Sequence, residues 1–192
     1  MPNLGIVASS ISGHLIPPSS FYSIATVTAA GGETSLSFTS IPSTYKSLQI
    51  RYISKCTRTG GSSDDLKINY NSDTSANYTR HILYGDAVNV VASGVTGASY
   101  IGIANGTADT YSGLTNDFAA GIIDIIDYAN TSKNKTLRAF TGNDLNGLSG
   151  LSPYLGFTSG LWLSTSAITS IVIASTSPIF AAGSTFALYG VK

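Results

Sequence analysis

The feature that most constrains the fold of this chain is its shortage of the residues that build helices. Among 192 residues there is one Glu, one Gln and one Met, and these are side chains that enter a helix at little cost. A coiled coil or a helical bundle is therefore excluded. Eleven Tyr and seven Phe, with many aliphatic residues, supply the apolar surface that disordered chains lack. The composition predicts a compact all-β protein.

Stretches in which apolar and polar residues alternate recur from residue 19 onward. In the clearest one, 47–57, Leu48, Ile50 and Tyr52 fall on one face and the residues between them on the other. Further strands are expected at 23–28, 35–39, 66–70, 78–84, 88–92, 98–104, 118–128, 136–141, 154–164, 167–175 and 184–191, with loops at 105–116 and 142–152. Strand signals at roughly 8–12-residue spacing predict a single antiparallel β-sandwich, jelly-roll-like, over residues 19–192.

The first 18 residues differ from the rest of the chain. They contain no acidic residue and end in Pro17-Pro18, which imposes an extended conformation and interrupts pairing with the next segment of the chain. We interpret residues 1–18 as an extended N-terminal arm that packs on a neighbouring subunit. Its aliphatic side chains are the predicted partner-binding residues: Leu4, Ile6, Val7, Ile11, Leu15 and Ile16.

Burial of these side chains does not by itself suffice to order the arm. Six aliphatic side chains contribute on the order of 9–18 kcal/mol gross, at ~1.5–3 kcal/mol each. Fixing the backbone of eighteen residues costs about 18–36 kcal/mol, at ~1–2 kcal/mol per residue. We therefore expect the arm to gain backbone hydrogen bonds as well, by adding a strand to the edge of a neighbour's sheet.

Charged side chains are few and balanced. They make up 10% of the chain, with ten basic and ten acidic residues, against a typical share of ~25%. A nucleic-acid-binding protein would carry a basic excess on one face, so no nucleic-acid partner is expected. No apolar run reaches the ~20 residues that span a bilayer, and the N-terminus has no positive stretch typical of a secretory signal. Neither a membrane partner nor secretion is expected.

The sequence contains no convincing catalytic constellation. It has two histidines, His14 and His81, one cysteine, Cys56, and no Gly-x-Ser-x-Gly motif. A Cys56–His81 nucleophile pair is formally available, but a half-buried strand histidine is the simpler interpretation of His81. A single cysteine permits no intramolecular disulfide, and the ligand spacing of a zinc site is absent. We expect no catalytic residue, no metal and no cofactor.

Two further candidates are a glycosidase-type pair of carboxylates and two oxygen-rich loops. Asp124 and Asp127 are close in sequence, but residues three apart lie on opposite faces of a strand and share a face only in a helix. The loops 69–73 and 143–147 alternate oxygen-bearing side chains as a Ca²⁺ loop does. They lack the acidic residues of an EF-hand, so Asx turns are the expected structure.

Four blocks of the sequence resemble a widespread group of small tailed-bacteriophage virion proteins. They are SFTSIPSTYKSLQIR at 37–51, IDIIDYANTSKNKT at 123–136, SGLW at 159–162 with AITSI at 167–171, and FAAGSTFALYGVK at 180–192. Their order and spacing match this group over about residues 20–192. The combination is the specific signal, because each block alone is weak.

The resemblance implies a β-sandwich module of the virion without enzymatic activity. The expected role is that of a capsid decoration (cement) protein, which binds the major capsid protein and stabilises the lattice in particles assembled in the cytoplasm of a bacterial host. It also implies a homotrimer, whereas general symmetry rules favour a dimer. Two alternatives stay open: a tail, baseplate or fibre component, and a carbohydrate-binding (receptor-binding) adhesin that uses aromatic residues and loops such as 71–76 and 142–152.

Overall fold

The computed structural model describes residues 20–110, 116–145, 152–176 and 179–192. Within these ranges the chain forms twelve strands and no helix, which confirms the all-β prediction. The strands are β1 (Phe21–Thr28), β2 (Ser35–Phe38), β3 (Ser47–Thr59), β4 (Ser63–Tyr70), β5 (Tyr78–Gly85), β6 (Val90–Ala98), β7 (Ile101–Thr110), β8 (Ala119–Ile126), β9 (Lys135–Asn143), β10 (Tyr154–Trp162), β11 (Ile171–Ser175) and β12 (Thr185–Val191). The described part of the chain thus contains no helix that could cross a membrane.

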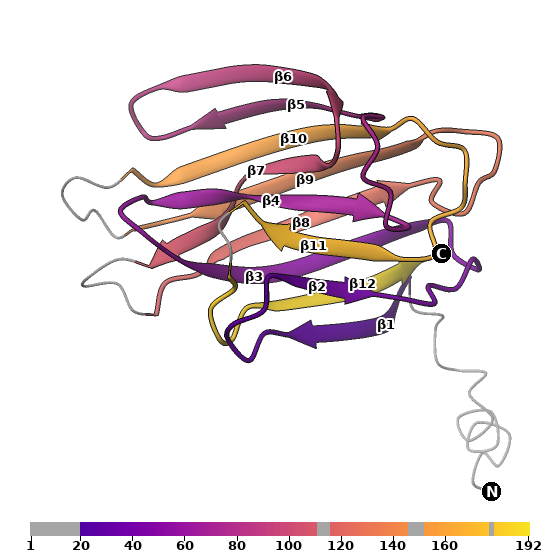
Figure 1. The fold of residues 1–192 in the computed structure, drawn as a ribbon, viewed down its shortest axis with the longest axis horizontal. Coiled ribbons are helices and arrows are strands. Elements are labelled where there is room, and N and C mark those ends of the chain that lie inside the picture. Colours follow the sequence, from indigo (N-terminus) through magenta and orange to yellow (C-terminus); the bar gives the residue numbers. More distant parts are fainter. Residues whose placement is uncertain (1–19, 111–115, 146–151, 177–178) are drawn as a thin grey trace, which may run out of the picture.

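Backbone pairing arranges the strands in two branches that meet at β3. The long branch has the order β1-β12-β3-β8-β9-β10-β5-β6, and the short branch has the order β2-β11-β4-β7. They join where the C-terminal part of β3 runs parallel to β7, with Lys55 opposite Ala108 and Thr59 opposite Thr110. The other pairings among the described strands are antiparallel, so the sheet is mixed rather than purely antiparallel as predicted. Figure 1 shows the short branch lying in front of the long one.

The hydrophobic core lies between the two branches. Along β3, Leu48 and Ile50 are fully buried while Arg51 and Ile53 are exposed, because successive side chains of a strand point to opposite faces. Core residues of the short branch include Ile68, which belongs to the same hydrophobic cluster as those of β3. The inward face of the long branch is therefore covered, and we call the opposite face its outer face.

The structure corrects the prediction of a loop over 105–116, because β7 continues to Thr110. Asn105 and Gly106 resemble strand breakers in sequence, but they lie in a bulge where the pairing of β7 with β4 shifts register. Asn105 has a positive φ of 50° there, which Asn tolerates better than most residues. A Cβ on Gly106 would lie 2.9 Å from Leu66 Cγ, so a larger residue would collide with the core.

The region predicted as two short strands at 88–92 and 98–104 is also different. β6 runs through Gly94 and continues past a register shift at 96–97 to Ala98, and β7 begins only at Ile101. Gly94 lies opposite His81 of β5, and a Cβ there would lie 2.8 Å from the imidazole Cδ2. The glycine therefore allows close packing within a strand, where the sequence suggests a turn.

The described chain begins at one edge of the long branch. Ser20 precedes β1, and its carbonyl accepts a hydrogen bond from the backbone N–H of Lys192 at 3.2 Å. The two ends of the described chain are thus adjacent. The predicted N-terminal arm, residues 1–18 with Leu4, Ile6, Val7, Ile11, Leu15 and Ile16, lies outside the described residues.

Candidate functional site

The structure does not bring Cys56 and His81 together. Cys56 is fully buried, and its thiol donates a hydrogen bond to Asp109 Oδ1 at 3.2 Å. His81 lies on the outer face of β5 and borders a groove on that face. It is exposed rather than half-buried, because no strand of the short branch covers this side of the sheet. The pair has no geometry for nucleophilic catalysis.

Asp124 and Asp127 each form an ion pair with a different basic side chain. Asp124, on the outer face of β8, accepts hydrogen bonds from Gln49 Nε2 at 2.8 Å and Arg138 Nε at 3.0 Å. Asp127 lies beyond the end of β8, with a φ of 54°, and its carboxylate is 3.0 Å from Lys133 Nζ. The two carboxylates therefore do not face one substrate position, but the predicted strand to residue 128 is too long, since β8 ends at Ile126 and Asp127 lies in the turn after it.

The oxygen-rich loop 69–73 is a structural corner. Asn71 has a positive φ of 51°, and its Oδ1 accepts hydrogen bonds from the backbone N–H groups of Thr169 at 2.9 Å and Ser170 at 3.1 Å. Its Nδ2 donates to the carbonyl of Ala167 at 2.8 Å. These bonds hold the loop against the segment before β11, as an Asx-type interaction does. Asn71 Oδ1, the oxygen that would bind a cation, already accepts these backbone hydrogen bonds.

Asp73 completes this corner. Its carboxylate accepts hydrogen bonds from Asn77 Nδ2 at 2.8 Å, the backbone N–H of Ser75 at 2.9 Å and Trp162 Nε1 at 2.7 Å. These donors, first that of Asn77, favour the charged form and lower the pKa of Asp73 to about 2. In the second candidate loop, residues 146 and 147 lie outside the described residues, and Asn143 Nδ2 donates to the carbonyl of Ser62 at 2.8 Å.

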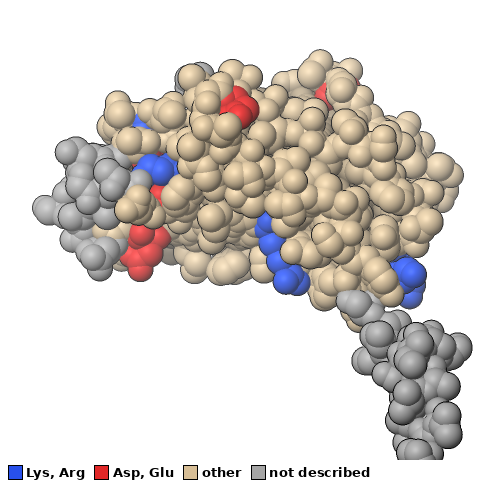
Figure 2. Space-filling model, turned by 90° about the horizontal axis from the view of Figure 1, so that it is seen from below, with Lys and Arg blue, Asp and Glu red and all other residues tan. Residues whose placement is uncertain are grey.

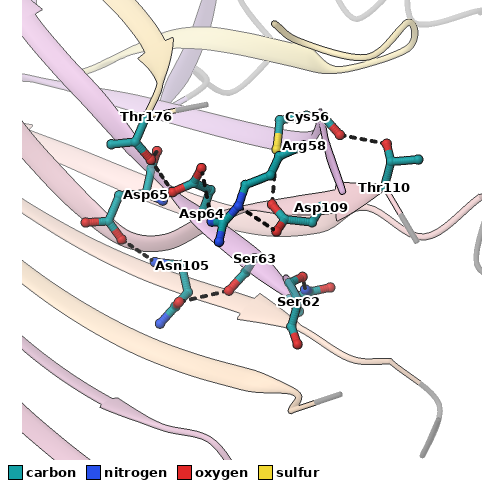
Figure 3. A network of polar contacts seen from close by, with 11 residues as sticks. Cys56, Arg58, Ser62, Ser63, Asp64, Asp65, Asn105, Asp109, Thr110 and Thr176 are labelled. Atoms are coloured by element: carbon teal, nitrogen blue, oxygen red, sulfur yellow. Dashed lines mark hydrogen bonds and ion pairs between the residues drawn. The ribbon is translucent and has the colours of Figure 1, made fainter. Parts of the chain in front are cut away.

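A cluster that the sequence did not predict lies where the two branches join. It consists of Cys56 and Arg58 of β3, Asp64 of β4 and Asp109 of β7, and we call it the polar cluster (Figure 3). Its members come from three strands, and the cysteine and Asp109 are 53 residues apart. No local spacing in the sequence could have revealed it, and the expected loop at 105–116 concealed the strand that carries Asp109.

One carboxylate of the polar cluster, that of Asp109, is buried with an incomplete set of hydrogen bonds. Arg58 Nη1 lies 3.5 Å from Asp64 Oδ2, and Arg58 Nε lies 3.7 Å from Asp109 Oδ2. Asp109 is 1% exposed, and its Oδ2 receives no hydrogen bond from the described residues. Burial therefore raises the pKa of Asp109, an effect that the Cys56 hydrogen bond and the Arg58 charge partly offset.

The surroundings of the polar cluster fix its geometry. Thr110 Oγ1 donates to the carbonyl of Cys56 at 2.8 Å, and the Thr176 hydroxyl donates to the carboxylate of Asp64 (Figure 3). Gly61 passes so close that a Cβ there would lie 2.4 Å from Asp109 Oδ2. The backbone thus forms one wall of the cluster and excludes water from Asp109.

The chemistry available to the polar cluster is limited. One ligand atom from each of Cys56, Asp64 and Asp109 lies within 4.8 Å of the others, a spacing suited to a cation. The guanidinium of Arg58 already supplies positive charge beside both carboxylates. We therefore interpret the polar cluster as an ion-pair network that closes the junction of β3, β4 and β7.

The outer face of the long branch carries an exposed apolar row. Strand register places Ile122 opposite Phe140, Phe140 opposite Phe157, and Phe157 opposite Leu83. These four side chains are 42–53% exposed, and the two phenylalanine rings have centroids 5.0 Å apart. We call them the apolar rung. A contiguous exposed patch of this kind on a sheet is typical of an interaction surface.

A polar row runs beside the apolar rung. The same register aligns Gln49, Asp124, Arg138, Ser159 and His81 across five strands. Together the two rows line a groove of about 630 Å³. Asp124 is neutralised by Arg138 within the chain, so a partner that covers this face does not need to neutralise an isolated carboxylate.

Charged side chains are scattered over the face of the described residues that Figure 2 shows. Seen from the β1 and β12 side, Lys, Arg, Asp and Glu appear as isolated spots on an otherwise uncharged surface (Figure 2). Several basic side chains are also paired with carboxylates, among them Lys55 with Asp117 at 2.7 Å and Arg80 with Asp65 at 2.6 Å. This distribution does not resemble the basic face of a phosphate-binding protein.

The described residues thus form an all-β fold whose outer face carries an exposed apolar row beside a polar row. No family model matches the chain, and no curated protein matches it either.

Proposed function

We propose that this chain is a non-enzymatic structural protein of a tailed-bacteriophage virion, with the role of a capsid decoration (cement) protein. The observation that carries the proposal is the apolar rung, which lies exposed on the outer face of the long branch. Burial of half-exposed apolar side chains against a capsid protein would be favourable. Interface cores are likewise depleted in charged residues, and the balanced composition of the chain suits repeated contacts in a lattice.

The strand order supports a jelly-roll interpretation of the fold. A jelly roll has two facing sheets, with the orders B-I-D-G and C-H-E-F when its eight strands are lettered from B to I. The short branch corresponds to the first order, with β2, β11, β4 and β7 as B, I, D and G. In the long branch β3, β10, β5 and β6 correspond to C, H, E and F, with β8 and β9 inserted and β1 and β12 added.

The positions of the catalytic candidates support a non-enzymatic role. Cys56 is buried beside Asp109, His81 lies on the outer face, and Asp124 is paired with Arg138. Each of these side chains is in a different environment, and no nucleophile among these candidates lies beside a base in the way that covalent catalysis requires.

Electron microscopy of purified particles tests the proposal. An antibody against the full chain, with gold detection, is expected to label the whole capsid, and quantitative mass spectrometry is expected to find a copy number comparable to that of the capsid lattice sites. Label confined to the tail would replace the decoration role with the tail, baseplate or fibre role. Particles that lack the protein altogether would refute the proposal.

A carbohydrate-binding role is the second candidate, favoured by one observation. The rings of Phe140 and Phe157 lie beside the planar polar groups of Gln49, Asp124 and Arg138. Sugars bind to such a combination through their apolar faces and their hydroxyls. Glycan-array binding by the full chain that is lost in Phe157→Ala would favour this role, and an array without signal would remove it.

A further inference from the structure

The β5–β6 hairpin is the least covered part of the long branch. β6 pairs with β5 alone among the described strands, and most of its residues are exposed. Val90 is 78% exposed and Val95 41% exposed. In Figure 1 the hairpin lies at the top of the molecule, beyond the strands of the short branch. β6 therefore leaves two faces and one edge open.

The open edge of β6 carries neither charge nor proline. Val90–Ala98 contains no charged residue and no proline. Charged residues and prolines commonly keep an edge strand from pairing with another chain. The pairing of β6 with β5 shifts register between Val95, opposite Arg80, and Ala98, opposite Tyr78, so the regular part of the edge is Val90–Val95. The other edges are irregular or short. β1 contains a register shift between Ser23 and Ala25, and the guanidinium of Arg51 lies 4.8 Å from the ring centroid of Phe21. β2 has only four residues.

The hairpin is nevertheless well ordered by its own turn. Asp86 Oδ1 accepts hydrogen bonds from the backbone N–H of Val88 at 3.1 Å and of Asn89 at 2.6 Å. These donors lower the pKa of Asp86. The backbone N–H of Asp86 also donates to the carbonyl of Asn89 at 3.1 Å. β6 is thus presented as a preformed strand, so a partner strand does not have to order it.

The side chains of β6 define what could pair with it. Val90 and Ala92 lie on the outer face, opposite Gly85 and Leu83, and Val91 and Val95 lie on the other face. Both faces offer small or apolar side chains. A complementary strand would be apolar on both faces and uncharged, as strands buried on both sides are.

The N-terminal segment of the chain has these properties. Residues 4–11, LGIVASSI, are uncharged, and in a strand Leu4, Ile6 and Ala8 fall on one face while Val7 falls on the other. Nineteen residues precede Ser20, where the described chain begins. Residues 12–19, which link the segment 4–11 to Ser20, span at most about 26–29 Å when fully extended.

The starting point of this segment favours a second copy as the acceptor. Ser20 lies beside β1, at the opposite edge of the long branch from β6. Seven strand spacings separate the two edges, or about 34 Å at ~4.8 Å each. The link formed by residues 12–19 is shorter than this path across the outer face to β6 of its own molecule. A neighbouring copy can instead present its β6 edge directly.

We propose that residues 4–11 of one copy add a strand to β6 of a second copy. The proposal rests on the proposed assembly role and assigns the contact through which copies associate. Main-chain hydrogen bonds supply the binding, and the alternating side chains supply register, as in other strand additions. Because donor and acceptor lie at opposite edges, the contact is head-to-tail, and a closed ring, such as the expected trimer, satisfies all copies.

Cross-linking between two full-length variants tests this contact. Ile6→Cys is mixed with Ser93→Cys of β6 and treated with a short bis-maleimide, and Ile6→Cys mixed with Ile53→Cys is the matched control. Ile53 is exposed on the outer face of β3, away from the hairpin, and the native Cys56 is buried and should contribute little. We expect at least a tenfold higher yield of the cross-linked pair for Ser93→Cys than for the control.

The outcomes are exclusive. Equal yields in the two mixtures overturn the proposal, as does a cross-link that forms only within one molecule of an Ile6→Cys, Ser93→Cys double variant. Leu4→Cys and Ala8→Cys cover a shifted register, and Val95→Cys replaces Ser93→Cys if circular dichroism shows loss of fold. Particle labelling is independent of this test. Labelled capsids without the cross-link overturn the contact alone, and the cross-link without label overturns the virion role alone.

Discussion

The corner around Asp73 and the polar cluster around Asp109 shift the pKa of a carboxyl group in opposite directions. Asp73 is only partly buried and accepts three hydrogen bonds, and its pKa is lowered to about 2. Asp109 is almost fully buried, one of its oxygens receives no hydrogen bond from the described residues, and its pKa is raised by burial. The larger number of donors at Asp73 and the deeper burial of Asp109 account for the opposite directions of the two pKa shifts.

The strongest test of this comparison removes the Asp73 carboxylate. Asp73→Ala leaves the indole N–H of Trp162, which is 2% exposed, without its acceptor, together with two other donors. We expect the free energy of unfolding to fall by roughly 2–4 kcal/mol, since unsatisfied buried donors cost about 1–3 kcal/mol each. Urea denaturation measures it, with Asp86→Ala in the exposed turn as the control. A loss no larger than that of the control would contradict the assignment.

Gly61→Ala tests the crowding of the polar cluster. The added Cβ would lie 2.4 Å from Asp109 Oδ2, so the buried Asp109 side chain or the turn that carries Gly61 must shift, and we expect a loss of about 1–3 kcal/mol. Gly142→Ala is the matched control, because its nearest neighbour would be an ordinary 3.9 Å away. In an Asp109→Ala background the effect of Gly61→Ala should shrink. An undiminished effect would place the collision elsewhere.

The pH dependence of stability separates the two aspartates by sign. Asp73 has a folded pKa of about 2 against an ordinary value of 3.8, so its contribution is complete above pH ~4 and is lost as pH falls towards 2, by up to roughly 2 kcal/mol. Asp109 acts in reverse, because its raised pKa favours the protonated form and its contribution declines as pH rises above its ordinary pKa. Thermal melting of Asp73→Asn from pH 2 to 7 should show a flatter acid limb than the unmodified chain. An unchanged limb would mean that other carboxylates cause the acid loss.

Neutralising Asp109 should have the smallest effect. Asp109→Asn keeps the shape of the side chain and removes a charge that lacks a full set of donors, while the Arg58 guanidinium stays 46% exposed and hydrated. We expect the free energy of unfolding at pH 7 to change by less than about 1 kcal/mol. Urea denaturation of Asp109→Asn and Asp73→Asn in parallel compares their free energies of unfolding. A loss as large as that of Asp73→Asn would show that the Arg58 ion pair outweighs the cost of burial.

The sequence predicts the architecture better than it predicts the polar sites. Alternation at 47–57 identifies the buried face of β3 correctly, because Leu48 and Ile50 pack inward, and the β-branched run at 118–128 is correctly a strand rather than a helix. The predicted strand boundaries are wrong at Asn105 and Gly94, two residues of types that commonly interrupt strands. A bulge and a close contact with His81 accommodate them within strands.

The polar cluster and the apolar rung depend on which strands are neighbours. Cys56 meets Asp109 only because β3 runs parallel to β7, and Phe140 meets Phe157 only in the observed register. Neither relation leaves a local periodic pattern. The predicted arm at 1–18 lies outside the described residues, so its prediction stands or falls with the cross-linking experiment.

The adjacency of Ser20 and Lys192 has a mechanical consequence. A pull transmitted through the chain that precedes Ser20 enters the fold at β1, which among the described strands pairs with β12 alone. β12 is bonded on both sides, to β1 and to β3. Tension therefore detaches β1 from β12 first and leaves the remaining strands of the long branch paired. Under load, β1 unfolds before the body of the protein does.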